Sequence, residues 1–121
     1  MKLATTADKT RVLFHCPGCE EAHCVTVNGA RNEVTNATWG WNQSLDKPTF
    51  TPSILVTGVK MTEKGIAQYE AWRASGMPQP VPTFENAPQR CHSFVTDGRI
   101  QFLNDCSHAL AGKTVELPDW E

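Results

Sequence analysis

The sequence predicts a small, β-rich α+β fold, with one domain over residues 1–121, a zinc-knuckle hairpin near the start and one main helix. Short alternating apolar segments separated by Gly, Pro and Asn turns recur along most of the chain, which is typical of strands. Only residues 62–75 carry apolar side chains at helical spacing. All five cysteines and all four histidines fall within or beside two clusters, one near each end of the chain. This distribution predicts one folded site where the two ends meet.

The first expected element is a hairpin over residues 11–27. Residues 11–15 and 24–27 have the composition of strands, and a turn dipeptide ends the second one. The Cys-Pro-Gly-Cys turn between them makes a knuckle at the tip. Cys24 is expected to face the core as a small hydrophobic residue.

Short strands are also expected in the middle of the chain, at residues 38–42 and 53–57. The prolines within residues 47–52 exclude a central strand between them. Towards the end, residues 109–112 are expected to form a single helical turn, and residues 115–118 close the fold.

The expected helix covers residues 62–75, with Thr62 as its N-cap and with Gly76 and Pro78 at its end. The residues that follow are rich in proline and predict an extended excursion. The helix and this excursion together occupy residues 62–88.

The strongest turn signal is Asp97-Gly98, which predicts a C-terminal hairpin over residues 91–104. A two-residue loop pairs Thr96 with Arg99 and fixes the register of the two strands. Because a shift of one residue would turn every side chain to the other face, this register also decides which residues share a face.

Alternation in this register places His92 and Asp105 on one face of the hairpin and Cys91, Ser93 and Cys106 on the other. Asp105 is then the diagonal neighbour of His92, at a typical backbone separation of about 7–8 Å that two side chains can close. A carboxylate at that position would fix the tautomer of the imidazole and stabilise its charged form, as an acid–base histidine requires.

The nucleophile for such a histidine must come from another element. Ser53 is the best candidate, because it begins a strand directly after Pro52, whereas Ser93 points away from His92. Structural roles compete with this hypothesis, since isolated serines and histidines are usually structural and Asp105 could cap the turn that follows it.

The two cysteine clusters also predict a metal site. Cys16 and Cys19 offer two thiolates from one tight turn, and zinc takes four N or S ligands in a tetrahedron. His23 from the same hairpin and Cys106 and His108 from the C-terminal cluster compete for the other two places. The preferred set is Cys16, Cys19, Cys106 and His108, with His23 in reserve. About one zinc per chain is expected, in a structural role, because metal binding stabilises a small core.

A redox Cys-x-x-Cys pair is the main alternative for these two thiols. It is less favoured because the redox motif normally opens a helix, whereas the residues after Cys19 lead into a strand. The odd number of cysteines argues against a disulfide framework and for a reducing compartment.

Composition excludes several other classes of protein. The formal net charge of -2 gives no basic surface for nucleic acid or for anionic membranes. No apolar run approaches the roughly 18 residues that span a bilayer. The first residues lead into charged ones, so no secretory signal is expected.

A set of specific motifs runs from the first hairpin to the end of the chain. They are Phe14-x-Cys16-Pro17-Gly18-Cys19, His23, Trp41-Asn42 and residues 48–53, 91–103, 105–112 and 117–118. Together they resemble a family of small proteins of tailed bacteriophages and prophages, whose members often carry the label ammonia monooxygenase. The absence of a membrane-spanning run gives that label no support.

A more distant similarity links Pro52-Ser53-Ile54, the His92-x-Phe94 pair and the strand after Gly98 to the peptidase encoded in bacterial ubiquitin-like conjugation operons. This resemblance implies that Ser53 is the nucleophile and His92 the base. It does not extend to the role of Asp105.

The main interpretation is therefore a zinc-stabilised serine-type endopeptidase of phage origin that cleaves a peptide bond or a ubiquitin-like conjugate. Its catalytic residues would be Ser53, His92 and Asp105. We expect a protein or peptide substrate, no nucleic acid, no membrane, and a location in the cytoplasm of the host bacterium or in the virion. One alternative is a non-catalytic zinc-binding module for virion assembly or counter-defence. Another is a zinc-dependent hydrolase in which His92, His108 or Asp105 binds the metal.

Overall fold

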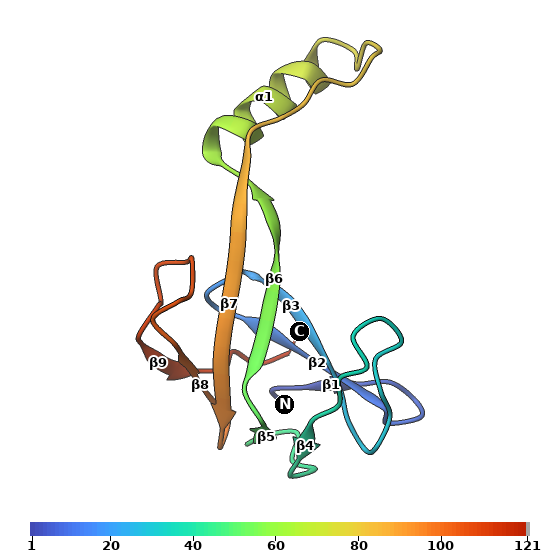
Figure 1. The fold of residues 1–121 in the computed structure, drawn as a ribbon, viewed down its shortest axis with the longest axis vertical. Coiled ribbons are helices and arrows are strands. Elements are labelled where there is room, and N and C mark those ends of the chain that lie inside the picture. The colour runs from blue at the N-terminus through green and yellow to red at the C-terminus, as the bar shows by residue number, and fades with distance from the viewer. Residues whose placement is uncertain (121) are drawn as a thin grey trace. The chain divides into compact units, whose positions relative to one another are not determined.

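The computed structural model describes residues 1–120, which form nine strands and one α-helix (Figure 1). The predicted α+β class, rich in strands and with one helix, is confirmed. The chain divides into two compact units. The larger unit contains Met1–Val56 and the described residues from Arg90 onwards, and the helical unit contains Thr57–Gln89. No helix within residues 1–120 is long and apolar enough to cross a membrane.

The first sheet of the larger unit has three antiparallel strands in the order β1-β2-β3. They are β1 (Ala4–Thr5), β2 (Arg11–Cys16) and β3 (Glu21–Thr26). β2 and β3 form the predicted hairpin, with Phe14 opposite His23 and Cys16 opposite Glu21. Alternation along β2 buries Val12, Phe14 and Cys16, so the first thiol of the knuckle lies on the core side.

Cys24 does not face the core, and that prediction is wrong. The residue is exposed and pairs with Leu13, whereas its neighbours His23 and Val25 are buried. Residues directly opposite each other in an antiparallel pair point to the same face. The inward side of β2 therefore selects His23 and Val25 and turns Cys24 outwards.

A second sheet has the order β6-β7-β8-β9. Its strands are β6 (Ile54–Met61), β7 (Asn86–Thr96), β8 (Arg99–Phe102) and β9 (Thr114–Glu116). Ser93 pairs with Phe102 and Thr96 with Arg99, which confirms the predicted register and the two-residue loop. Asp97 and Gly98 both have positive φ, 50° and 76°, as a type I′ turn requires.

Two short elements complete the larger unit. β4 (Gly40–Trp41) pairs with β5 (Phe50–Thr51) as a small separate ribbon. Residues 109–112 form hydrogen-bonded turns in place of the expected helical turn. The turns are closed by bonds from Ala111 N to the His108 carbonyl and from Lys113 N to the Leu110 carbonyl.

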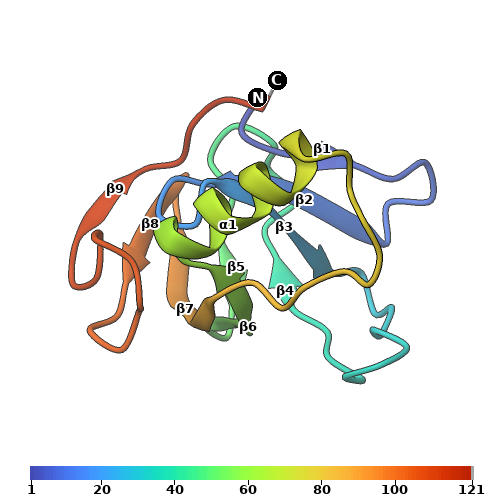
Figure 2. The same ribbon diagram turned by 90° about the horizontal axis from the view of Figure 1, so that it is seen from above.

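Both sheets contribute to one hydrophobic core. Its largest fully buried side chains include Leu3, Val12, Phe14, Val25, Phe50, Val95, Ile100, Phe102 and Leu117. Each such side chain stabilises the fold by about 1.5–3 kcal/mol relative to exposure. The ends of the described chain also meet, since the Trp120 N–H donates to the Met1 carbonyl at 2.8 Å (Figure 2).

The helical unit contains α1 (Glu63–Ala74), whose limits match the prediction. The Thr62 hydroxyl accepts from the Gly65 N–H at 3.1 Å, as an N-cap does. Gly65 packs against the Glu85 backbone so closely that a Cβ there would collide with it. The residues after the helix therefore run along its first turn.

Candidate catalytic site and metal-binding cluster

Ser53 lies in the connection between β5 and β6, directly after Pro52. Its carbonyl accepts a 3.1 Å hydrogen bond from the indole Nε1 of Trp39. The backbone N–H of Trp39 in turn donates to the Thr26 carbonyl at 2.9 Å. Trp39 therefore ties the backbone of Ser53 to strand β3. No pattern in the sequence marked Trp39 for this role.

His92 lies on β7 and contacts both other members of the predicted catalytic group. Its Nε2 is 3.0 Å from Ser53 Oγ, and its Nδ1 is 3.2 Å from Asp105 Oδ2. A carboxylate only accepts, so Nδ1 carries the ring proton and donates to Asp105. Nε2 is then the acceptor in the neutral ring, and the Ser53 hydroxyl donates to it. The structure thus brings Ser53, His92 and Asp105 together in the order that sequence reasoning proposed.

The hairpin register explains how Asp105 reaches His92. The pairing continues one step beyond β8, where the Leu103 N–H donates to the His92 carbonyl at 2.9 Å. Asp105 lies two residues further along the chain and returns to the face of His92. The His92 side chain is 27% exposed and that of Asp105 is 42% exposed, so solvent and a substrate can reach both.

Arg90 is a second neighbour of Asp105 that sequence reasoning missed. Its Nε lies 3.5 Å from the same Oδ2 atom that contacts His92. Arg90 and His92 are two residues apart on one strand, so they share a face. The spacing of two residues between Arg90 and His92 could have predicted this contact, because it places both side chains beside Asp105.

The segment after Asp105 is fastened to β7 by two residues in succession. The Cys106 thiol accepts from the His92 N–H and donates to the His92 carbonyl, both at 3.2 Å. The Ser107 N–H donates to the Arg90 carbonyl at 2.8 Å, and its Oγ accepts from the Arg90 N–H at 2.9 Å. These bonds hold the backbone of His92 in register with Asp105.

A separate cluster brings together Cys16, Cys19, Cys91 and His108. Their candidate ligand atoms all lie within 4.8 Å of one another, and the three cysteines are buried. The predicted set is therefore corrected at one place, because Cys91 occupies the position that had been given to Cys106. Strand alternation placed Cys91 and Cys106 on the same face of the hairpin, so the sequence offered both thiols and the structure selects Cys91.

His23, the reserve ligand, lies outside this cluster. It is buried on β3 and contacts Phe14 edge to face, with ring centroids 5.5 Å apart. It lies close enough to Cys16 to help lower the pKa of that thiol. His23 is therefore a neighbour of the cluster and not part of it.

Two observations on His108 test whether the cluster suits a metal. Nε2 of His108 is buried and has no hydrogen-bond partner among the described residues, although such an atom normally has one. Gly18, in the knuckle between the two cysteines, packs directly against the His108 ring, and a Cβ there would collide with it. The knuckle is thus shaped to receive this imidazole. Three thiols and one imidazole form a donor set typical of structural zinc.

Two thiols of the cluster lie within reach of each other. Cys16 Sγ and Cys91 Sγ are 3.8 Å apart. Hydrogen bonding with Cys91 lowers the pKa of Cys16 to about 4, with smaller contributions from His23 and from the Cys19 N–H. The same contact and burial raise the pKa of Cys91. The pKa values of the two thiols therefore move in opposite directions, and a cation bound between them would favour the thiolate form of both.

The two sites are interleaved along the chain. Cys91 faces the cluster and the next residue, His92, faces the catalytic group. In the segment after β8, Asp105 faces the catalytic group and His108 the cluster. Anything that moves Cys91 or His108 therefore also moves the backbone of a catalytic residue.

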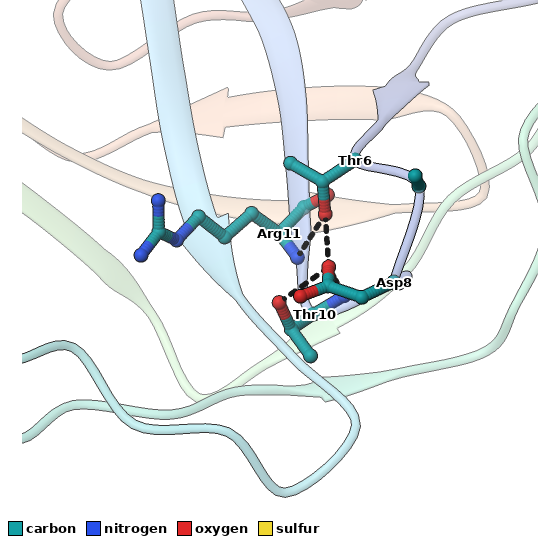
Figure 3. Close-up of a pocket in the computed structure, with 5 residues that line it drawn as sticks. Thr6, Asp8, Thr10 and Arg11 are labelled. Atoms are coloured by element: carbon teal, nitrogen blue, oxygen red, sulfur yellow. Dashed lines mark hydrogen bonds between the residues drawn. The ribbon is translucent and has the colours of Figure 1, made fainter.

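A surface pocket also lies at the turn between β1 and β2, and none of the candidate residues lines it (Figure 3). Its carboxylate, Asp8, accepts from Thr6 Oγ1 at 2.7 Å and from Thr10 Oγ1 at 2.8 Å. These bonds lower the pKa of Asp8 to about 2. The network closes the turn and leaves nothing in the pocket that suggests chemistry.

A serine hydroxyl, an imidazole and a carboxylate in hydrogen-bonded order are the arrangement of a serine hydrolase. The family model described as "bacterial ubiquitination-like system serine protease (BubE)" matches residues 1–103, and the chain belongs to this family. The match includes Ser53 and His92 and ends before Asp105. No curated protein and no solved structure matches the chain.

Proposed function

We propose that this protein is a zinc-stabilised serine-type endopeptidase that cleaves a peptide bond or the bond of a ubiquitin-like conjugate. The observation that carries the proposal is the contact of Ser53 Oγ with His92 Nε2 at 3.0 Å, with Asp105 on the opposite ring nitrogen. Hydrogen-bonded nucleophile, base and orienting group are what covalent catalysis by serine requires. Membership of the serine protease family supports the same class of reaction.

In the first half of the reaction, His92 Nε2 accepts the proton of Ser53 as Oγ attacks the substrate carbonyl carbon. The imidazolium that results is stabilised by the carboxylate of Asp105 at Nδ1. His92 then donates its proton to the leaving amine or alcohol, and the carbonyl-to-leaving-group bond breaks. Ser53 is left as an acyl ester.

In the second half, a water molecule attacks the acyl carbon and His92 Nε2 accepts the proton of that water. His92 returns this proton to Ser53 Oγ as the ester bond breaks, which releases the carboxylate product and restores the enzyme. Asp105 keeps the same contact with Nδ1 throughout, so one orientation of the ring serves both halves.

The residues that would hold zinc are Cys16, Cys19, Cys91 and His108. When bound, the metal would supply structural cross-linking between the knuckle, β7 and the C-terminal segment. Four protein ligands fill a tetrahedral site, whereas catalytic zinc sites keep one position open for water. This donor count supports a structural role and argues against the zinc-dependent hydrolase.

The direct experiment is cleavage of a ubiquitin-like protein extended at its C-terminus or joined there to a target. Ser53→Ala and His92→Ala should each abolish cleavage, because members of a catalytic unit fail together. Both variants should keep the melting temperature of the wild type to within a few degrees. If Ser53→Ala cleaves at the normal rate, the serine mechanism is wrong and the metal-based alternative must be tested. If the wild type also cleaves nothing, the non-catalytic binding module is favoured.

The same proposal includes the setting that the resemblance to phage and prophage proteins implies. The enzyme would act in the cytoplasm of the host bacterium, on a protein or peptide substrate. The four-ligand cluster of thiols and imidazole is compatible with that reducing compartment.

A further inference from the structure

The outer face of the β7–β8–β9 sheet carries exposed side chains in two rows. Phe94 pairs with Gln101, and Gln101 pairs with Thr114. One step closer to the Asp97-Gly98 turn, Thr96 pairs with Arg99. The three strands lie side by side in the larger unit (Figure 1).

A pocket of about 440 Å³ lies over these two rows. It is lined by Phe94, Thr96, Asp97, Arg99, Gln101 and Thr114. Phe94 contributes its aromatic ring and is 41% exposed, because alternation turns it to the solvent face while its neighbours Ser93 and Val95 are buried. The exposed ring offers apolar surface that a ligand side chain could cover.

This pocket lies next to the catalytic group along β7, although none of the three catalytic residues lines it. Phe94 follows His92 by two residues on β7, so both side chains lie on the same face, about 7 Å apart along the strand. Asp105 contacts His92 from the β8 side, and the pocket begins at the next residue pair towards the turn. A substrate held at Ser53 could therefore reach the pocket with a residue one or two positions from the bond being cleaved.

We propose that this pocket is a substrate subsite, that it binds one apolar side chain of the substrate, and that Phe94 is its specificity-determining residue. The inference rests on the serine peptidase function proposed above and adds a preference to it. The expected ligand is an aliphatic or aromatic residue of an extended peptide segment.

The chemistry of the lining favours an apolar ligand over a charged one. Phe94 provides the only large apolar surface among the six lining residues, and Thr96, Gln101 and Thr114 are uncharged. The two charged residues of the lining, Asp97 and Arg99, are opposite in sign, so the pocket has no cluster of one sign that would select a charged ligand. Arg99 Nε is also 4.0 Å from Glu116 Oε1, so its charge is already partly compensated.

The test compares covalent probes that differ in one side chain. A set of tripeptidyl diphenylphosphonates carries Ala, Leu, Phe or Glu at one position at a time, and a small fluorophosphonate without a peptide serves as reference. The measured quantity is the ratio of labelling rates for the Leu and Ala probes, so effects on Ser53 itself cancel. At one position, we expect the Leu probe to label Ser53 at least about ten times faster than the Ala probe, which is the discrimination that a few buried methylenes provide. The Glu probe should label no faster than the Ala probe at that position.

Phe94→Ser should reduce that ratio to within about twofold of one, whereas Phe94→Leu should keep most of it because an apolar wall remains. Val34→Ser, at an apolar residue that is 92% exposed, is the matched control and should keep the full ratio. A wild-type ratio near one at every position, or an unchanged ratio in Phe94→Ser, would overturn the subsite while labelling by the small probe still supported the peptidase. Failure of the small probe to label Ser53 would overturn the peptidase and the subsite together.

Discussion

His92 Nε2 lies 3.0 Å from Ser53 Oγ, although 39 positions separate the two residues in the chain. The close approach of the two side chains depends on how the backbones of Ser53 and His92 are each held in position. Trp39 holds the Ser53 backbone against β3, and the Cys106 thiol holds the backbone of His92 from both its N–H and its carbonyl. Neither side chain belongs to the catalytic group, yet each fixes the position of one member of it.

The first prediction concerns the orientation of the His92 ring. Asp105→Asn replaces an acceptor-only group by an amide that can also donate, so the Nε2-protonated tautomer becomes available and cannot accept the Ser53 proton. The rate of cleavage should fall on the order of 10²- to 10⁴-fold with little change in melting temperature. Steady-state kinetics and thermal unfolding of the same preparations measure both.

Asp46→Asn is the control for this substitution, because Asp46 is an exposed carboxylate whose contact is with the N-terminal amine. It should retain the wild-type rate. Equal rates in Asp105→Asn and the wild type would mean that Asp105 does not orient His92.

The second prediction separates the ligands of the metal from its neighbours. Cys91→Ser should lose zinc and lower the melting temperature by more than about 10 °C, since metal-binding energy is also folding energy. Cys106→Ser should keep its zinc, because its thiol bonds to the backbone of His92 and not to the cluster. Zinc content by elemental analysis of the two purified variants decides between the two ligand sets. Loss of zinc in Cys106→Ser together with retention in Cys91→Ser would reverse the assignment.

The third prediction tests the shape of the knuckle. Gly18→Ala places a methyl group against the His108 ring and should displace that imidazole from the cluster. The affinity for zinc should fall by about 10- to 100-fold, measured by competition with a chromogenic chelator. Gly58→Ala is the matched control, because a Cβ at Gly58 meets nothing within 4 Å. Identical zinc affinities in the two variants would show that His108 does not depend on this contact.

Several elements could be predicted because a local signal determines them. Asp97-Gly98 fixed the loop length, and with it the pairing of Ser93 with Phe102. Thr62 and Gly76 fixed the limits of the helix for the same reason, since an N-cap and a residue of positive φ act on their immediate neighbours.

The identity of the fourth cluster residue depends on tertiary packing. Cys91 and Cys106 both point away from the face of His92, so alternation alone could not choose between them. Cys91 belongs to the cluster because its thiol lies close to those of Cys16 and Cys19. The Cys106 thiol instead donates to the His92 carbonyl on β7. The prediction for Cys24 was wrong for a related reason. The pairing of β3 with β2 determines which face of β3 is buried, and that pairing is a tertiary feature.

The proposed mechanism requires above all that Ser53 is a nucleophile activated by His92. A fluorophosphonate reacts covalently with such a serine, so the decisive measurement is the mass and location of its adduct on the wild-type protein. We predict one adduct per chain on the peptide that contains Ser53, none there in Ser53→Ala, and labelling at least about 100-fold slower in His92→Ala. An unlabelled wild type, or an adduct that persists in Ser53→Ala, would contradict the serine mechanism.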